Sequence, residues 1–166
     1  MCANFCNIFI YVFTAESIST EEIVTVEKYD LVTKEMEIKK SNLVTALPYI
    51  AKEYKISFDL FVTEHQAAIS SVIHFTTDGN MGKYGDRIPG IWIFKKKLEI
   101  MSAVSGNHNY HFIHTTDLEE GKWINVEISQ TLVGDKVRKA VKTHQLVLFG
   151  NISQWKPGGM GVSIDF

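Results

Sequence analysis

The stretch KISFDLFVT, residues 55–63, alternates apolar and polar side chains over most of its length. Its apolar positions are Ile56, Phe58, Leu60 and Val62, and its polar positions are Lys55, Ser57, Asp59 and Thr63. Phe61 interrupts the polar face. Because successive side chains of a β-strand point to opposite faces, this period of two predicts a strand with one buried face.

The same period recurs along the chain. WINVEIS, residues 123–129, sets Ile124, Val126 and Ile128 against Asn125, Glu127 and Ser129, and KEMEIK, residues 34–39, alternates in the same way. Shorter apolar runs cover residues 23–31, 71–76, 91–94, 98–104, 110–114, 146–149 and 161–166. Strands at this spacing predict an antiparallel all-β domain, and the uneven connections favour a two-sheet sandwich over a barrel.

The sandwich makes a prediction about side-chain faces. We expect Ile56, Phe58, Leu60, Ile124, Val126 and Ile128 to be buried between the sheets, with Lys55, Ser57, Asn125 and Glu127 facing outward. The one helix-like stretch, Leu43–Tyr54, is short and contains Pro48, so we expect a loop or a single turn there.

Composition sets the class of protein. The chain has 166 residues, a net charge of −2 and a pI near 6.3. This length supports one domain with its own core. A near-neutral charge argues against a general nucleic-acid binder, which would carry a basic excess. No apolar run approaches the roughly 18 residues that would span a bilayer.

The amino terminus carries an apolar stretch, Phe5–Ala15, of the length of a signal-peptide core. Small residues at Ala15 and Ser17 predict cleavage after Ser17, so that residues 1–17 are a signal peptide and residues 18–166 a single β-sandwich domain. No Lys or Arg precedes the stretch, and an ordinary first strand is the alternative. Cys2 and Cys6 both lie before the cleavage point, which argues against a cysteine nucleophile or a zinc–thiolate site in the mature protein.

The segments KEYKISFDLFV, SVIHFTTDGNMGKYGDRIPGIWIF, LEIMSAVSGNHNY and GKWINVEISQ follow one another between residues 52 and 133. In this order they resemble the concanavalin A-like lectin and laminin G-like superfamily, in particular invertebrate extracellular modules with an HFTTxGNxGKYGDRIP loop. The resemblance implies a jelly-roll sandwich of two antiparallel sheets. Relatives often carry cysteines at the positions of Met101 and His111, which suggests a bond between neighbouring strands that this chain lacks.

The most distinctive segment is TTDGNMGKYGDRIPGIW, residues 76–92, which is too long for a plain hairpin of about two to five residues. Carboxylates and amides bond sugar hydroxyls, and an aromatic ring stacks on the C–H face of a sugar. We therefore expect a ligand surface where the loop Asp78–Pro89 docks against Ser105–Tyr110. Its candidate residues are Asp78, Asn80, Tyr84, Asp86, Arg87, Asn107, Asn109 and Tyr110. The alternative is a self-contained loop, in which Asp86 and Arg87 bond their own backbone or a neighbouring loop.

Calcium is a further candidate ligand, held by Asp78 or Asp86 together with Asn107. The match to an EF-hand loop is poor, because Pro89 replaces the closing glutamate. No other cofactor is indicated.

Catalysis is not supported by the sequence. Glu127 is the single acid on its strand, whereas a glycan-active enzyme of this superfamily needs paired carboxylates. His108, His111 and His114 are three residues apart, so they alternate faces on a strand and do not converge on one metal.

Two basic runs, Lys95–Lys97 in a predicted turn and KVRKAVK at residues 136–142, suggest acidic polysaccharide as an alternative ligand; for the second run, a solvated edge strand protected by its charge is the other interpretation. Asn151 begins an N-glycosylation sequence, which agrees with secretion. We therefore expect a secreted, extracellular, non-catalytic module that recognises carbohydrate or an extracellular protein.

Overall fold

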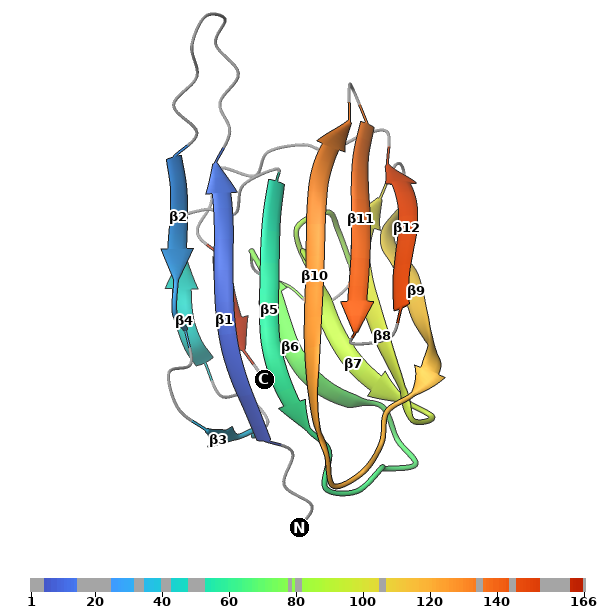
Figure 1. The fold of residues 1–166 in the computed structure, drawn as a ribbon. Helices are drawn as coiled ribbons and strands as arrows, with labels where there is room; N and C mark the ends of the chain where they lie inside the picture. Colours follow the sequence, from blue (N-terminus) through green and yellow to red (C-terminus); the bar gives the residue numbers. More distant parts are fainter. Residues whose placement is uncertain are drawn as a thin grey trace, which may run out of the picture.

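The computed structural model describes residues 5–14, 25–31, 35–39, 43–47, 53–77, 79, 82–104, 107–133, 136–143, 146–152 and 162–165; side chains are described between residues 29 and 130, except that of Val104. These residues form an all-β protein with two antiparallel sheets and contain no helix. Figure 1 shows the two sheets face to face, with β1, β5 and β10 in front of β6, β7 and β8.

The first sheet has seven strands in the order β12-β11-β10-β5-β1-β2, with β3 paired to β1. Their bounds are Phe5–Thr14 (β1), Thr25–Tyr29 (β2), Met36–Glu37 (β3), Glu53–Phe61 (β5), Trp123–Val133 (β10), Lys136–Thr143 (β11) and Leu146–Ile152 (β12). The second sheet has six strands in the order β4-β13-β6-β7-β8-β9. Their bounds are Leu43–Leu47 (β4), Ser70–Thr76 (β6), Gly90–Phe94 (β7), Lys97–Val104 (β8), Asn107–Asp117 (β9) and Val162–Asp165 (β13).

The core lies between the sheets and draws side chains from both. β5 and β10 contribute from the first sheet, and β6, β7 and β8 contribute from the second. The largest fully buried side chains are Phe58, Phe75, Ile56, Leu60, Ile73, Ile91, Leu98, Ile100 and Ile128. Burial of this apolar surface is the main favourable free energy of the fold.

The prediction of side-chain faces on β5 and β10 is confirmed. All the predicted inward residues are buried, except that Ile124 is half-buried against the core. On the outward face, Lys55 Nζ lies 2.6 Å from Glu127 Oε2, and Asn125 Nδ2 donates to Asp59 Oδ1 at 2.8 Å. The period of two predicted the buried faces of these strands correctly, because each strand is exposed to solvent on one face only.

The prediction of a loop or turn across Leu43–Tyr54 is wrong at both ends. Leu43–Leu47 is strand β4, which pairs with β13, and β5 already begins at Glu53. The backbone groups of β4 find their partners on a strand more than a hundred residues away, so pairing overrides the weak local pattern. Residues 48–52 lie outside the described residues.

The segment assigned to a signal peptide contains β1. This strand pairs with β5 from Phe5↔Phe61 to Phe13↔Glu53 and with β2 on its other side. Cleavage after Ser17 would remove a strand from the interior of the first sheet. The signal peptide and the first strand remain the two interpretations of this segment, and they predict different mature chains.

The carboxy-terminal part supplies three strands. β11 and β12 extend the first sheet, and β13 inserts between β4 and β6 of the second. Met101 and His111 are cross-strand partners on β8 and β9, as the resemblance implies for its cysteine positions. Within the described residues, the chain has no helix that is long and apolar enough to cross a membrane.

Candidate functional site

The two segments expected to form a ligand surface lie at the same end of the second sheet. One connects β6 to β7 and the other connects β8 to β9, and all these neighbouring strands are antiparallel. We refer to residues 82–89 together with residues 107–110 as the rim.

Residues 85–89 continue the line of β7 between its two neighbours. On the β6 side, Thr77 N donates to Gly85 O at 2.9 Å, and Phe75 N donates to Pro89 O at 3.0 Å. On the β8 side, Ala103 N donates to Arg87 O at 3.2 Å. The exit of the long loop is therefore held by backbone bonds on both sides, without a regular ladder.

Asp86 organises the loop from within. Its side chain is 2% exposed, and Oδ2 accepts hydrogen bonds from Gly82 N at 2.6 Å and Lys83 N at 2.9 Å. A Cβ added to Gly79 would lie 2.6 Å from Asp86 Oδ1, so this close approach requires glycine. The carboxylate thus closes a turn of its own chain.

Arg87 fastens the loop to the outer face of the second sheet. Its Nη1 donates to Asn109 Oδ1 and contacts Met101 Sδ at 2.6 Å, and its Cζ lies 4.5 Å from the centroid of the Trp92 ring. Trp92 and Met101 alternate along β7 and β8 with core residues such as Ile91 and Ile100, so they lie on the face opposite the core. Arg87 is 7% exposed and covers this face.

Two buried acidic residues, Glu99 and Asp86, act on the charge of Arg87. Burial lowers the pKa of Arg87 from its ordinary value, and the charges of Glu99 and Asp86 act in the opposite direction. Glu99 is itself 7% exposed and lies 2.8 Å from His111 Nδ1 through its Oε1. Charged groups of both signs therefore stabilise one another beneath the loop.

The rim also presents aromatic rings to solvent. The exposed fractions of Tyr84 and Tyr110 are 47% and 43%. The Tyr84 ring meets the His108 ring at 6.4 Å in an edge-to-face arrangement, and the Tyr110 ring meets Phe112 at 4.8 Å. His108 and Tyr110 are two residues apart on β9 and so share a face of the strand.

The predicted docking of the two segments is confirmed for residues 82–89 and 107–110. Arg87 joins Asn109, and Tyr84 joins His108. The contacts that the self-contained alternative predicts are present: Asp86 bonds backbone groups of its own loop, and Arg87 bonds Asn109 of the neighbouring segment. Asp78 and Asn80 lie outside the described residues, as do Ser105 and Gly106.

Among the remaining candidates, Asn107 is exposed and accepts a hydrogen bond from Asn109 N at 2.9 Å, and Asn109 is half-buried. In the part of the chain that the structure describes, no group of three or more His, Cys, Asp or Glu side chains is placed to hold a metal ion. Asn151 lies on β12 opposite Arg138 of β11.

The two basic runs lie in different settings, the first at the turn between β7 and β8 and the second on β11. Lys97 Nζ bonds Asp117 Oδ1 at 2.7 Å and Thr115 O at 2.6 Å, so a carboxylate compensates its charge. Residues 136–142 belong to β11, which lies between β10 and β12. The interpretation of this run as an edge strand is therefore wrong.

Trp92, Glu99, Met101 and His111 hold the loop, a role that the sequence did not predict for them. Glu99 was the available signal, because its charged side chain stands between the apolar residues Leu98 and Ile100 of β8. No protein family, curated protein or solved structure matches the chain.

Proposed function

We propose that this protein is a secreted, non-catalytic recognition module with a jelly-roll sandwich, and that its rim binds carbohydrate. One observation carries the proposal. Asp86 and Arg87 hold the loop in place while Tyr84 and Tyr110 stay about half exposed at its surface.

The arrangement suits a sugar for a physical reason. A ring held in advance loses little conformational freedom when a ligand stacks on it, so more of the contact free energy contributes to affinity. The two tyrosine hydroxyls offer donors and acceptors on those rings, and the exposed Asn107 amide offers others elsewhere on the rim. Asp86 and Arg87 act as positioning residues in this proposal, since they are buried.

The position of Glu127 supports the proposal that the protein is not catalytic. Its carboxylate is paired with Lys55 at 2.6 Å on the outward face of the first sheet, whereas the rim belongs to the second sheet. A carboxylate held by a lysine is poorly placed to give a proton to a substrate.

A glycan array probed with the full chain, with and without calcium, tests the proposal. We expect binding to a defined set of glycans, with Tyr84→Ala and Tyr110→Ala each weakening it about tenfold. Phe94→Ala is the control, because it removes an exposed ring, 36%, from outside the rim. Binding to no glycan, or unchanged binding by both tyrosine variants, would contradict the proposal and favour a protein ligand.

A further inference from the structure

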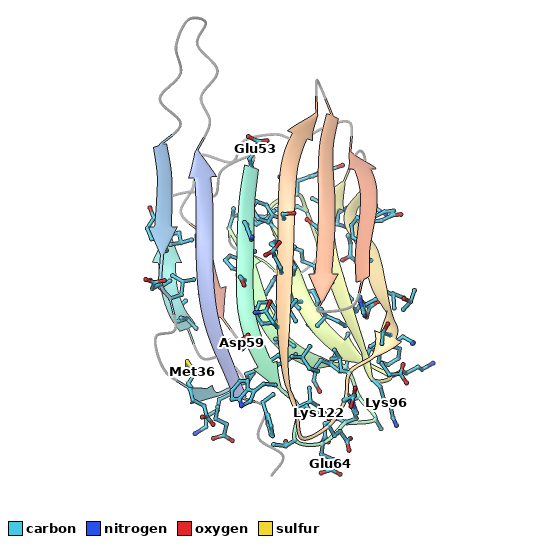
Figure 2. The ribbon with its side chains drawn as sticks, viewed as in Figure 1. Met36, Glu53, Asp59, Glu64, Lys96 and Lys122 are labelled. Atoms are coloured by element: carbon cyan, nitrogen blue, oxygen red, sulfur yellow. The ribbon has the colours of Figure 1, made fainter. Side chains whose placement is uncertain are left out.

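A pocket of about 370 Å³ lies where β9 turns into β10. Its lining includes Asp59, Asp117, Glu119, Lys122, Trp123 and Asn125. β11 pairs with β10 only from Val126 onward, so the residues of β10 that line the pocket have no paired residue in β11. Figure 2 labels Asp59 and Lys122 toward this end of the molecule.

The pocket is separate from the rim. β9 begins in the rim at Asn107 and ends in the pocket at Asp117. Along β9 the rim ends at Tyr110 and the pocket lining begins at His114, and the strand ends at Asn107 and Asp117 are about 30 Å apart at about 3.3 Å per residue. In Figure 2, Glu53 marks the opposite end of β5 from Asp59.

An exposed aromatic ring forms one wall. Trp123 is 46% exposed, and its ring is backed by Phe61 at a centroid distance of 5.3 Å. The strand register pairs Trp123 with Phe61 and Asn125 with Asp59. Because residues two apart on a strand share a face, these four side chains form one patch on the outer face of the first sheet.

The charges around the pocket do not cancel. Three carboxylates line it, and two of them have lysine partners: Glu119 pairs with Lys122, and Asp117 pairs with Lys97 at 2.7 Å. The remaining carboxylate, Asp59, accepts a hydrogen bond from the neutral Asn125 amide at 2.8 Å. Among the residues described here, no lysine, arginine or histidine pairs with Asp59.

We propose that this pocket binds a small organic cation, with an alkylated ammonium group between the Trp123 ring and the Asp59 carboxylate. The face of a tryptophan ring carries negative potential and attracts ammonium groups, most strongly where water is excluded. Asp59 adds a full negative charge beside that face. Leu118 and Ile124, which pack against the core, line the inner side of the pocket.

Choline chloride is the probe. Its titration into isotopically labelled full-length protein is followed through the Trp123 indole resonance, which is assigned by its loss in Trp123→Phe. Sodium chloride at equal concentration controls for ionic strength. Dimethylbutanol, the neutral isostere in which carbon replaces the choline nitrogen, separates charge from shape. We expect saturable binding of choline and binding of the isostere weaker by about tenfold.

Two matched variants complete the test. Asp59→Asn keeps the size of the side chain and removes its charge, and it should weaken choline binding about tenfold. Glu53→Gln removes one carboxylate from the other end of the same strand and should leave binding unchanged. The proposal is overturned if choline fails to shift the Trp123 resonance, if the isostere binds equally well, or if a neutral methyl glycoside saturates the site with Asp59→Asn having no effect. None of these outcomes bears on glycan binding at the rim.

Discussion

The guanidinium carbon of Arg87 lies 4.5 Å from the centroid of the Trp92 ring, on the outer face of the second sheet. Trp92 is 8% exposed although it faces away from the core, because the loop between β6 and β7 folds over it. Trp92 and Arg87 therefore form a small packing site on the outer face of the second sheet, separate from the core. The stability of the loop, and with it the orientation of Tyr84, depends on that site.

Arg87→Lys should destabilise the protein by about 1–3 kcal/mol, because lysine cannot reproduce the planar guanidinium that stacks on Trp92 and reaches Asn109. Urea unfolding followed by tryptophan fluorescence measures the loss. The control is Lys95→Met, which removes an exposed cation 5.1 Å from the Phe94 ring. This change should cost less than about 0.5 kcal/mol. Equal losses for the two variants would contradict the structural role given to Arg87.

Asp86→Ala should release the turn at residues 82–86. Both hydrogen bonds to Asp86 Oδ2 are lost, and we expect a cost of about 1–3 kcal/mol together with faster amide hydrogen exchange at Gly82 and Lys83. Asp86→Asn retains an acceptor oxygen and should show a smaller effect on both measurements. Unchanged exchange at these two amides in Asp86→Ala would show that the carboxylate does not hold the turn.

Gly85→Ala and Gly121→Ala form a matched pair, because both glycines have positive φ, 98° and 71°. At Gly121 a Cβ meets no described atom within 4 Å, whereas at Gly85 it would lie 2.5 Å from Thr77 Oγ1. We expect a cost of about 1 kcal/mol at Gly121 from backbone strain alone. At Gly85 we expect a further loss of stability of about 1–3 kcal/mol, because the added methyl group would collide with Thr77. Adding Thr77→Ala should recover part of the loss at Gly85, and no recovery would argue against the steric explanation.

The stability of the folded protein should depend on pH through Asp117. The hydrogen bond from Lys97 lowers the pKa of Asp117 below its ordinary value of 3.8. A lowered pKa in the folded state means that the pair stabilises the protein above the pKa of the unfolded chain, and that this contribution disappears as pH falls through the folded-state pKa. Asp117→Asn should therefore melt at a lower temperature than the wild type near about pH 6 and at the same temperature near about pH 2. A gap between the melting temperatures that is independent of pH would refute this linkage.

The amino terminus offers a direct choice between its two interpretations. If residues 1–17 are a signal peptide, the protein secreted from eukaryotic cells should begin at Ile18. Intact mass and amino-terminal sequencing of the secreted protein measure this. Recovery of residues 5–14 in the secreted chain would contradict the prediction and support β1 as part of the mature sheet.

The sequence alone determined the features that repeat locally. The period of two in residues 55–63 and 123–129 identified β5, β10 and their buried faces, since alternation requires only that one side of a strand meets the core. The glycine-rich and polar composition of residues 76–92 also predicted a long loop that docks on residues 105–110. Backbone polar groups that are buried outside a strand ladder need hydrogen-bond partners, and the neighbouring polar loop can supply them.

The tertiary structure decided everything that depends on which distant residues meet. β4 is a strand because β13 pairs with it, a contact that no local pattern encodes. Lys97 is compensated because β9 places Asp117 beside it. Trp92 is buried because Arg87 covers its outward face. The Trp123 pocket exists because the strand register sets Asn125 opposite Asp59, and such pairings are fixed by the packing of the whole sheet rather than by the residues on either side.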